Sequence, residues 1–530
     1  MTELRVARGR PELVSPAAGD GSTFPVAGRR RPWLPPIPRP EDRADPARNL
    51  RIVVWLVLIQ LYLLFFAWYT ANETYELWGG FLLAPILFLI TAPFLRRGLE
   101  KVESDPVIRR LVILGLAAKL AAAFARYYAG EFLIGHADAV VYSVIGTDVA
   151  TEFRSFIFDG PILEQFTSTG GPGTIFIRVF TAVIYTFVTP SITAGYVIYS
   201  FMSFWGLYFF YRAFSIAMPD GLRRRYVLLL FFLPSMVFWP SSIGKEAWMT
   251  MAIGLGAYGL ARLIVYRRFG YVTIGIACLL MAVVRPHVAA IYVVGLASAV
   301  ILRRTKGESS GAAKRIVALL VMAALAGILL NRLQSFFDLE EGLNIGQALE
   351  ETTERSGTGG SEFTPVDPAS PVGLLLAIVT VLFRPFLFEV RNLAAMFTAL
   401  EGTFLIGLFV WNAARLLRLP AAIIKRPYVG FAVLYTVAFA FAFAAIANFG
   451  ILARQRTQVF PIAVVMLSIP IEPVVQTRHG LQRAGRRDQR RSIGSDLSVG
   501  SDTSVGPDYR ASVSQGVELE PTGAEGASTE

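Results

Sequence analysis

The sequence predicts an all-α polytopic membrane protein of about 12–14 membrane segments, with a region of loops and juxtamembrane helices on the outer face. Of its 530 residues, 54% are hydrophobic and the mean hydropathy is +0.52, whereas soluble proteins contain roughly 45–50% apolar residues. The apolar residues are concentrated in runs of about 17–22, the length that crosses ~30 Å of hydrocarbon. Alternating segments of ~10 residues, which would indicate a membrane β-barrel, are not found.

The runs lie in a membrane domain at 51–475, between two polar tails. The predicted spans are 52–69, 79–96, 110–127, 174–190, 194–212, 226–240, 246–265, 271–285, 288–302, 315–331, 371–388, 392–411, 429–448 and 457–472.

The two tails are predicted to be disordered and cytoplasmic. Residues 1–50 are rich in Arg and Pro and contain no apolar run of the kind found in a cleavable signal peptide. Residues 476–530 are of low complexity. Cys278 is the only cysteine, which excludes an internal disulfide, and it lies in an apolar run. The net charge of +11 comes from short basic loops, as in membrane proteins, and does not indicate nucleic-acid binding.

Basic loops set the expected orientation, because cytoplasmic loops are enriched in Lys and Arg. The basic segments assigned to the inside are 96–110, 221–226, 266–270, 303–315 and 415–427. Both termini are then cytoplasmic, in the cell membrane. This assignment requires that 371–388 does not fully cross, and that only one of the apolar runs 174–190 and 194–212 does so.

The same assignment places a set of unusual polar residues outside. The first large outer loop is 128–173 and the second is 332–370. In the first, HADAVVY carries Asp138 and Tyr142, which share one helical face. Asp138 is a candidate general base beside the membrane surface, and the alternative is an ordinary solvated loop helix.

Two short turns add cations to this face. SSIGKEAW places Lys245 and Glu246 at the start of a span, where Lys and free backbone N–H groups can hold an anion. VRPH places Arg285 and His287 on the outer side, where Arg is not expected without a partner or ligand. The alternatives are a snorkelling helix end for the first turn and structural ion pairing for the second.

Two later segments complete the candidate site. LFRPFLFE carries Arg384 in a Pro-broken apolar stretch. NFGILARQR carries Arg454 and Arg456, which could clamp a diphosphate or bind lipid headgroups. Tyr142, Lys245, Glu246, Arg285, His287, Arg384, Arg454 and Arg456 are the candidate substrate-binding residues. No Walker or dinucleotide-binding motif is present, and with three histidines in all a zinc site is not expected.

HADAVVY, the many-span body and NFGILARQR resemble the GT-C superfamily of integral membrane glycosyltransferases, in particular its dolichyl-phosphate-mannose-mannosyltransferase-like and lipid A arabinosyltransferase-like members. The resemblance covers roughly 50–472. The sequence departs from the family in two respects. It has one carboxylate, Asp138, where an acidic pair is usual, and two or three spans precede the first outer loop instead of one.

The resemblance implies a polyprenyl-phosphate-linked sugar as donor and a glycan, lipid or protein as acceptor. Asp138 would deprotonate the acceptor hydroxyl, and the arginines and Lys245 would stabilise the phosphate as it leaves. Some members use a divalent cation, and nothing in this sequence demands one.

Two other functions remain open. An envelope polysaccharide polymerase or ligase would use the outer arginines without needing Asp138 as a base. A transporter or flippase would place charges near the membrane midplane, for example Glu401 or Lys119 in a water-filled cavity.

Overall fold

The computed structural model describes residues 46–134, 138–266, 269–302 and 361–470, together with a few positions between 350 and 357. The predicted tail at 476–530, the predicted span 315–331, and most of the predicted tail 1–50 and outer loop 332–370 lie outside the described residues.

Helices make up the regular structure of the described residues, as predicted, and no strand longer than a single bridge occurs there. Four of these helices are long and apolar enough to cross a membrane: Asn49–Asn72, Tyr75–Val102, Lys245–Val265 and Leu393–Trp411. A fifth span is possible if the pair Pro172–Phe187 and Ile192–Ala217 counts as one. Among the described residues this is fewer than the predicted 12–14, because several predicted spans form apolar helices of only 10–17 residues.

The chain divides into two compact units, Met1–Trp78 and Gly79–Glu530. The described part of the first is α1 (Pro46–Asn72) and the residues that follow it. Large apolar side chains are exposed all round α1, including Trp55, Leu56 and Leu63. A helix that is apolar on every side needs an apolar environment, which a membrane would supply.

The second unit contains the remaining helices. Those that build its first half are α2 (Tyr75–Val102, which begins at the unit boundary), α3 (Pro106–Ala129), α4 (Asp138–Arg154), α5 (Pro161–Thr167), α6 (Pro172–Phe187), α7 (Ile192–Ala217), α8 (Arg223–Phe232) and α9 (Pro234–Phe238). A short π-helical turn, Gly130–Ile134, follows α3. The helices of its second half are α10 (Lys245–Val265), α11 (Gly270–Val284), α12 (Pro286–Leu302), α15 (Pro371–Phe383), α16 (Leu393–Trp411), α17 (Ala413–Leu416), α18 (Leu419–Lys425), α19 (Pro427–Phe443), α20 (Phe449–Gln455) and α21 (Phe460–Leu467).

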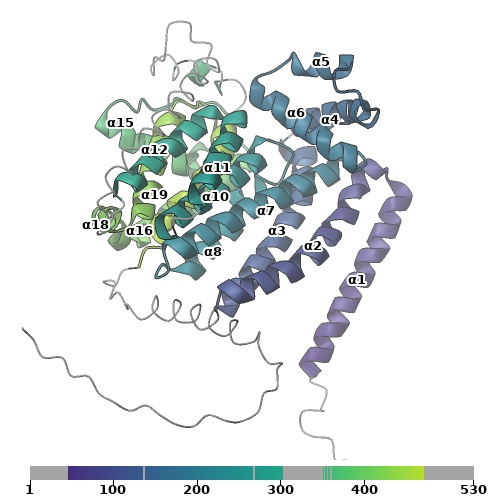
Figure 1. The fold of residues 1–530 in the computed structure, drawn as a ribbon, viewed down its shortest axis with the longest axis horizontal. Coiled ribbons are helices and arrows are strands. Elements are labelled where there is room, and N and C mark those ends of the chain that lie inside the picture. The colour runs from purple at the N-terminus through teal and green to yellow at the C-terminus, as the bar shows by residue number, and fades with distance from the viewer. Residues whose placement is uncertain are drawn as a thin grey trace, which may run out of the picture. The chain divides into compact units, whose positions relative to one another are not determined.

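Helix α10 lies at the centre of this unit and packs on α7 and α11, while α12 packs on α19 (Figure 1). The α7 and α10 backbones approach closely where two glycines face each other. A Cβ atom on Gly254 would lie 2.2 Å from the carbonyl oxygen of Gly206. Small residues at such crossings allow close helix packing in membranes, so these glycines let α7 and α10 approach closely.

Helices α4, α5 and α6 form a separate group at one end of α7 (Figure 1). Glu152 is buried and accepts hydrogen bonds from the backbone N–H groups of Ile162 and Leu163 at the start of α5. Its role in the fold is therefore to cap α5. Helices α6 and α7, which contain the two apolar runs 174–190 and 194–212, meet at a bend of 110°.

A break between α8 and α10 is held by two buried charged side chains. Pro234 starts α9, and Pro240 follows its end. Lys119 of α3 is fully buried, and its Nζ donates to the Ser241 hydroxyl at 2.7 Å and to the carbonyl oxygens of Val237 at 3.2 Å and Met236 at 3.3 Å. Lys119 thus satisfies backbone groups that the irregular segment leaves without helical partners.

Glu401 of α16 caps the other end of the same short helix. Its carboxylate accepts hydrogen bonds from the Ser235 backbone N–H, at 2.8 Å, and from the Ser235 hydroxyl. The charge in the middle of an apolar helix is therefore bonded to the N-terminus of α9, where the helix dipole favours a negative group.

Replacing Lys119 by Met is expected to lower the free energy of unfolding by about 1–3 kcal/mol, because buried carbonyl groups lose their donor. The measurement is reversible unfolding in mixed micelles. Lys101→Met, at the exposed end of α2, is the matched control and should unfold like the parent protein. Equal stability of Lys119→Met and the parent would show that the break does not depend on this amine.

Candidate functional site

A cavity of about 770 Å³ lies in the second unit. Its walls come from the C-terminal part of α3, the first turns of α4 and α10, part of the irregular segment 239–244, the start of α16 and most of α20. Segments that are distant in the sequence therefore meet here, and the break before α10 supplies four of the lining residues.

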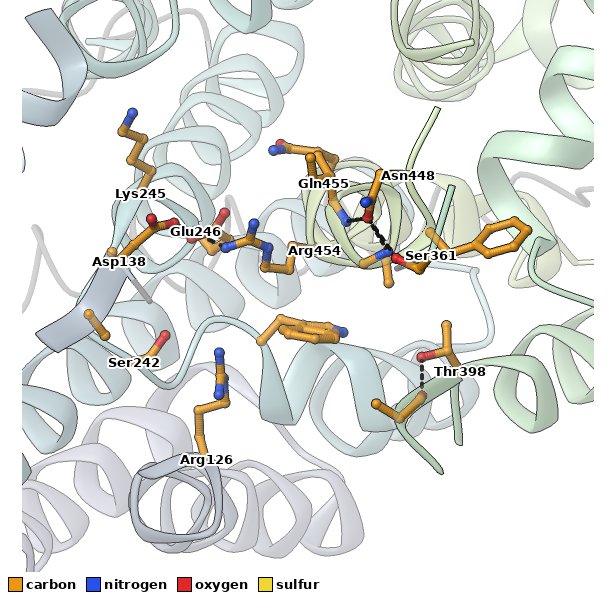
Figure 2. Close-up of a pocket in the computed structure, with 18 of the residues that line it drawn as sticks. Arg126, Asp138, Ser242, Lys245, Glu246, Ser361, Thr398, Asn448, Arg454 and Gln455 are labelled. Atoms are coloured by element: carbon orange, nitrogen blue, oxygen red, sulfur yellow. Dashed lines mark hydrogen bonds and ion pairs between the residues drawn. The ribbon is translucent and has the colours of Figure 1, made fainter. Parts of the chain in front are cut away.

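Six of the nine residues predicted to form the site line this cavity. They are Asp138, Tyr142, Lys245, Glu246, Arg285 and Arg454. The predictions had placed them together only through their assignment to one side of the membrane. The structure places them around one space (Figure 2).

Asp138 and Arg454 form an ion pair of 3.2 Å at the wall of the cavity. The Asp138 side chain remains 60% exposed, so it can meet a substrate as well as its partner. Burial lowers the pKa of Arg454, but the charges of Glu246 and Asp138 outweigh burial and hold that pKa above its usual value. Arg454 therefore carries its positive charge at all physiological pH values.

A second ion pair lies deeper. Arg285 donates to Glu246 at 3.0 Å and to the Gln455 side-chain oxygen at 2.5 Å. The side chains of Arg285 and Glu246 are only 9% and 12% exposed, so the two charges are almost removed from water. This matches the structural ion pairing that the sequence left open as the alternative role of Arg285.

Lys245 and Tyr142 supply polar groups without a counter-charge in direct contact. The Lys245 Nζ donates to the Thr174 hydroxyl at 2.8 Å and forms no ion pair with a described carboxylate. Burial, with the nearby charges of Asp138 and Glu246, raises the pKa of Tyr142 to about 12. Its hydroxyl therefore stays protonated and can donate a hydrogen bond into the cavity.

Asn448 fixes the helix that carries Arg454. Its side-chain oxygen accepts from the backbone N–H groups of Gly450 and Ile451 as the N-cap of α20, and from the Ser361 hydroxyl at 3.0 Å. Backbone hydrogen bonds between 361–363 and 447–449 complete this contact. The motif NFGILARQR thus begins with its own cap, and this explains why its arginines have fixed positions.

The other three predicted residues do not line the cavity. Arg384 pairs with Glu389 at 2.6 Å and stacks over the Phe363 ring at 4.4 Å, so it braces the segment beside Asn448. Arg456 is fully buried and donates to the Leu382 carbonyl oxygen. His287 lies near the start of α12 with its ring 5.7 Å from that of Phe443.

Arg126 lines the cavity and was missed in the sequence, where it lies inside the predicted span 110–127. It is 7% exposed, and its guanidinium lies 5.1 Å from the Phe238 ring centre and 5.3 Å from that of Trp239. Its Nε and Nη1 atoms are buried without a hydrogen-bond partner. Figure 2 shows Arg126 pointing toward the space beside Ser242 and below Arg454. The only available signal in the sequence was a cation inside an apolar run.

The six charged side chains that line the cavity among the described residues leave an excess of positive charge. Four are cationic and two are acidic, which gives a net charge of +2. Since Arg285 and Arg454 face the two carboxylates, the surplus lies on Arg126 and Lys245. This composition favours a dianionic ligand such as a phosphate group.

An apolar cavity of about 270 Å³ adjoins the first one. Four residues line both: Leu133, Trp239, Ala394 and Thr398. The rest of its wall is mainly apolar, with Phe238 and Phe397 among its members and Glu401 bonded to Ser235. The charged cavity and the apolar cavity therefore share part of their walls.

The part of the chain that the structure describes contains no group of three or more His, Cys, Asp or Glu side chains that could hold a metal ion. No protein-family model matches the sequence, and neither curated proteins nor solved structures give a significant match.

Replacing Glu246 by Gln is expected to lower the free energy of unfolding by about 3–5 kcal/mol, because it leaves Arg285 buried without its counter-charge. In a double-mutant cycle with Arg285→Gln, the two effects should be less than additive, with a coupling of about 0.5–3 kcal/mol. The measurement is reversible unfolding of the four proteins in mixed micelles. Additive effects would show that the interaction between Arg285 and Glu246 does not contribute to the free energy of unfolding.

Proposed function

We propose that the protein is a multi-pass cell-membrane glycosyltransferase that moves a sugar from a polyprenyl-phosphate donor to a glycan, lipid or protein acceptor on the outer face. The observation that carries the proposal is one cavity that combines an accessible carboxylate, surplus positive charge and an adjoining apolar space. A lipid-linked sugar phosphate has the matching parts: a hydroxyl-reactive anomeric carbon, an anion and an apolar chain.

In the proposed reaction, the acceptor hydroxyl oxygen attacks the anomeric carbon of the donor. The bond from that carbon to the phosphate oxygen breaks, and its electron pair leaves with the polyprenyl phosphate. Asp138 takes the proton of the acceptor hydroxyl as general base. A single displacement inverts the anomeric configuration.

Positive charge in the cavity favours departure of the phosphate. Negative charge grows on the phosphate oxygen as its bond to the sugar breaks, and fixed cations in a partly enclosed cavity stabilise that charge. Among the predicted residues, Lys245 is available to bind a phosphate or sugar oxygen, because its only described side-chain partner is the neutral Thr174 hydroxyl. Tyr142 can hold a sugar hydroxyl or phosphate oxygen through its protonated phenol.

Lys119 and Glu401, the two charges that a transporter would place in a water-filled cavity, do not support the transport hypothesis. Lys119 is fully buried and saturated by three acceptors around α9. Glu401 is bonded twice to Ser235 and faces the small apolar cavity. Both charges therefore have structural partners, and neither lines the large polar cavity.

The polymerase or ligase hypothesis differs from the transferase at one residue. Both functions use cations on a lipid-linked phosphate, but only the proposed transferase needs Asp138 as a base. The 3.2 Å ion pair with Arg454 holds Asp138 at the wall of the cavity, which suits either role.

Asp138→Asn should lower sugar transfer by about 10²–10⁴-fold, because the amide cannot accept the proton. The measurement is transfer of labelled sugar from a polyprenyl-phosphate donor, with the purified protein in liposomes and a panel of envelope acceptors. Asp148→Asn, on the same helix but outside the cavity, is the matched control and should keep its activity.

Two outcomes would contradict the proposal. If the parent protein transfers sugar only from diphosphate-linked glycans and Asp138→Asn remains active, the polymerase or ligase function replaces it. If neither class of donor supports transfer by the parent protein with any acceptor, the transferase function fails.

A further inference from the structure

The geometry points to a lipid-phosphate site in which Arg126 holds the phosphate and the apolar cavity between α3, α9 and α16 holds the first part of the chain. This deepens the proposed function and rests on it for the identity of the lipid as a polyprenyl phosphate. It assigns the anchoring role to a residue outside the predicted set, and it fixes the direction in which the substrate lies.

The surroundings of Arg126 favour binding of an anion. A guanidinium cannot lose its charge in a protein, so a buried one needs an acceptor for its N–H groups. Two of its nitrogens have none, although the side chain is more than nine-tenths buried. The Phe238 and Trp239 rings stabilise the cation but accept no hydrogen bond from those nitrogens. A phosphate oxygen would satisfy them.

The other cavity arginines are already engaged. Arg454 is paired with Asp138 and Arg285 with Glu246. A phosphate held by either would compete with a carboxylate of the protein. A phosphate at Arg126 would not compete with a carboxylate of the protein, so Arg126 is the preferred anchor among the lining arginines. Lys245 is the second cation within the same cavity.

The two aromatic rings beside Arg126, those of Phe238 and Trp239, also line the apolar cavity. Trp239 both stacks on Arg126 and lines the two cavities, and Ala394 and Thr398 line both from α16. A ligand with its phosphate at Arg126 can therefore pass its chain directly between the Trp239 ring and α16.

The outer edge of the apolar cavity is open and apolar. Leu133 and Phe397, which line it, are 59% and 60% exposed, and Phe132 next to Leu133 is 76% exposed. Apolar side chains of this size suit contact with lipid hydrocarbon, and a water-soluble sugar phosphate would gain nothing from them. The occupant is thus a membrane lipid with an apolar chain.

This arrangement orients the substrate. With the phosphate at Arg126 and the chain beside α16, the sugar extends toward Asp138 and Lys245, which lie near each other in the cavity (Figure 2). Tyr142 also lines the cavity. The general base and the leaving phosphate are then on different sides of the anomeric carbon, as an inverting displacement requires.

The test is binding of three probes to the purified full-length protein in detergent: a long-chain polyprenyl phosphate, the short geranyl phosphate and inorganic phosphate. Arg126→Gln should weaken binding of the long-chain probe by at least about 30-fold, as expected when a buried charge partner is removed. Arg262→Gln is the matched control, because Arg262 also stacks on an aromatic ring, Tyr258, but lies outside the cavity.

A second variant tests the chain site separately. Ala394→Trp fills the junction of the two cavities and should weaken the long-chain probe on the order of tenfold by removing buried apolar contact. Its effect on geranyl phosphate should be smaller. Leu400→Trp, on an exposed part of α16 outside both cavities, should leave all three affinities unchanged.

The outcomes are distinct. Unchanged long-chain affinity in Arg126→Gln, with a protein that unfolds at the parent temperature, overturns the anchor. Equal affinity of the parent for inorganic phosphate and for the long-chain probe shows an anion site without a chain site, and overturns the lipid assignment. Loss of long-chain binding in both variants, together with full activity of Asp138→Asn, upholds the lipid site while the proposed transferase chemistry fails.

Discussion

The irregular segment between α8 and α10 is the feature on which the rest of the site depends. Its prolines prevent one continuous helix, and the freed backbone groups cannot be left unsatisfied in an apolar protein interior. Lys119 and Glu401, from two other helices, supply those hydrogen bonds at opposite ends of α9. These hydrogen bonds stabilise the break, and the break determines where α10 begins with Lys245 and Glu246. Charges that look misplaced in the sequence are what make the break possible.

Electrostatic pairing then divides the cavity into occupied and available cations. Buried charges are costly unless paired, and the pairs Arg285–Glu246 and Arg454–Asp138 meet that need from within the protein. The pairs hold α10, α20 and the start of α4 together around the space. Because pairing consumes both acidic groups, the net charge of +2 is left for a ligand. One of the four charges in those pairs, Asp138, is exposed enough to act on a substrate while it also anchors Arg454.

Much of this site could be predicted from the sequence, since membrane topology limits which loops can meet. Assigning SSIGKE, VRPH and NFGILARQR to one face was sufficient to group Lys245, Arg285 and Arg454, which line one cavity. The number of spans was harder, because apolar runs interrupted by Pro fold into short helices that composition cannot distinguish from crossings. Arg384 and Arg456 come from the same kind of motif but face inward to Glu389 and the Leu382 carbonyl oxygen. Side-chain direction after a helix break is set by packing, which no local pattern records.

Arg126 is a site residue that the sequence did not predict. A cation inside an apolar run reads as a snorkelling side chain, and its neighbours in the sequence contain no acidic partner within one turn. Its setting is created by Phe238 and Trp239, more than a hundred residues away, at the end of the short helix α9. A residue held in this way has been desolvated by the fold without being neutralised by it. Such a group is unfavourable in the free protein and becomes favourable once an anion arrives, so the fold stores part of the binding energy for a charged ligand at this position.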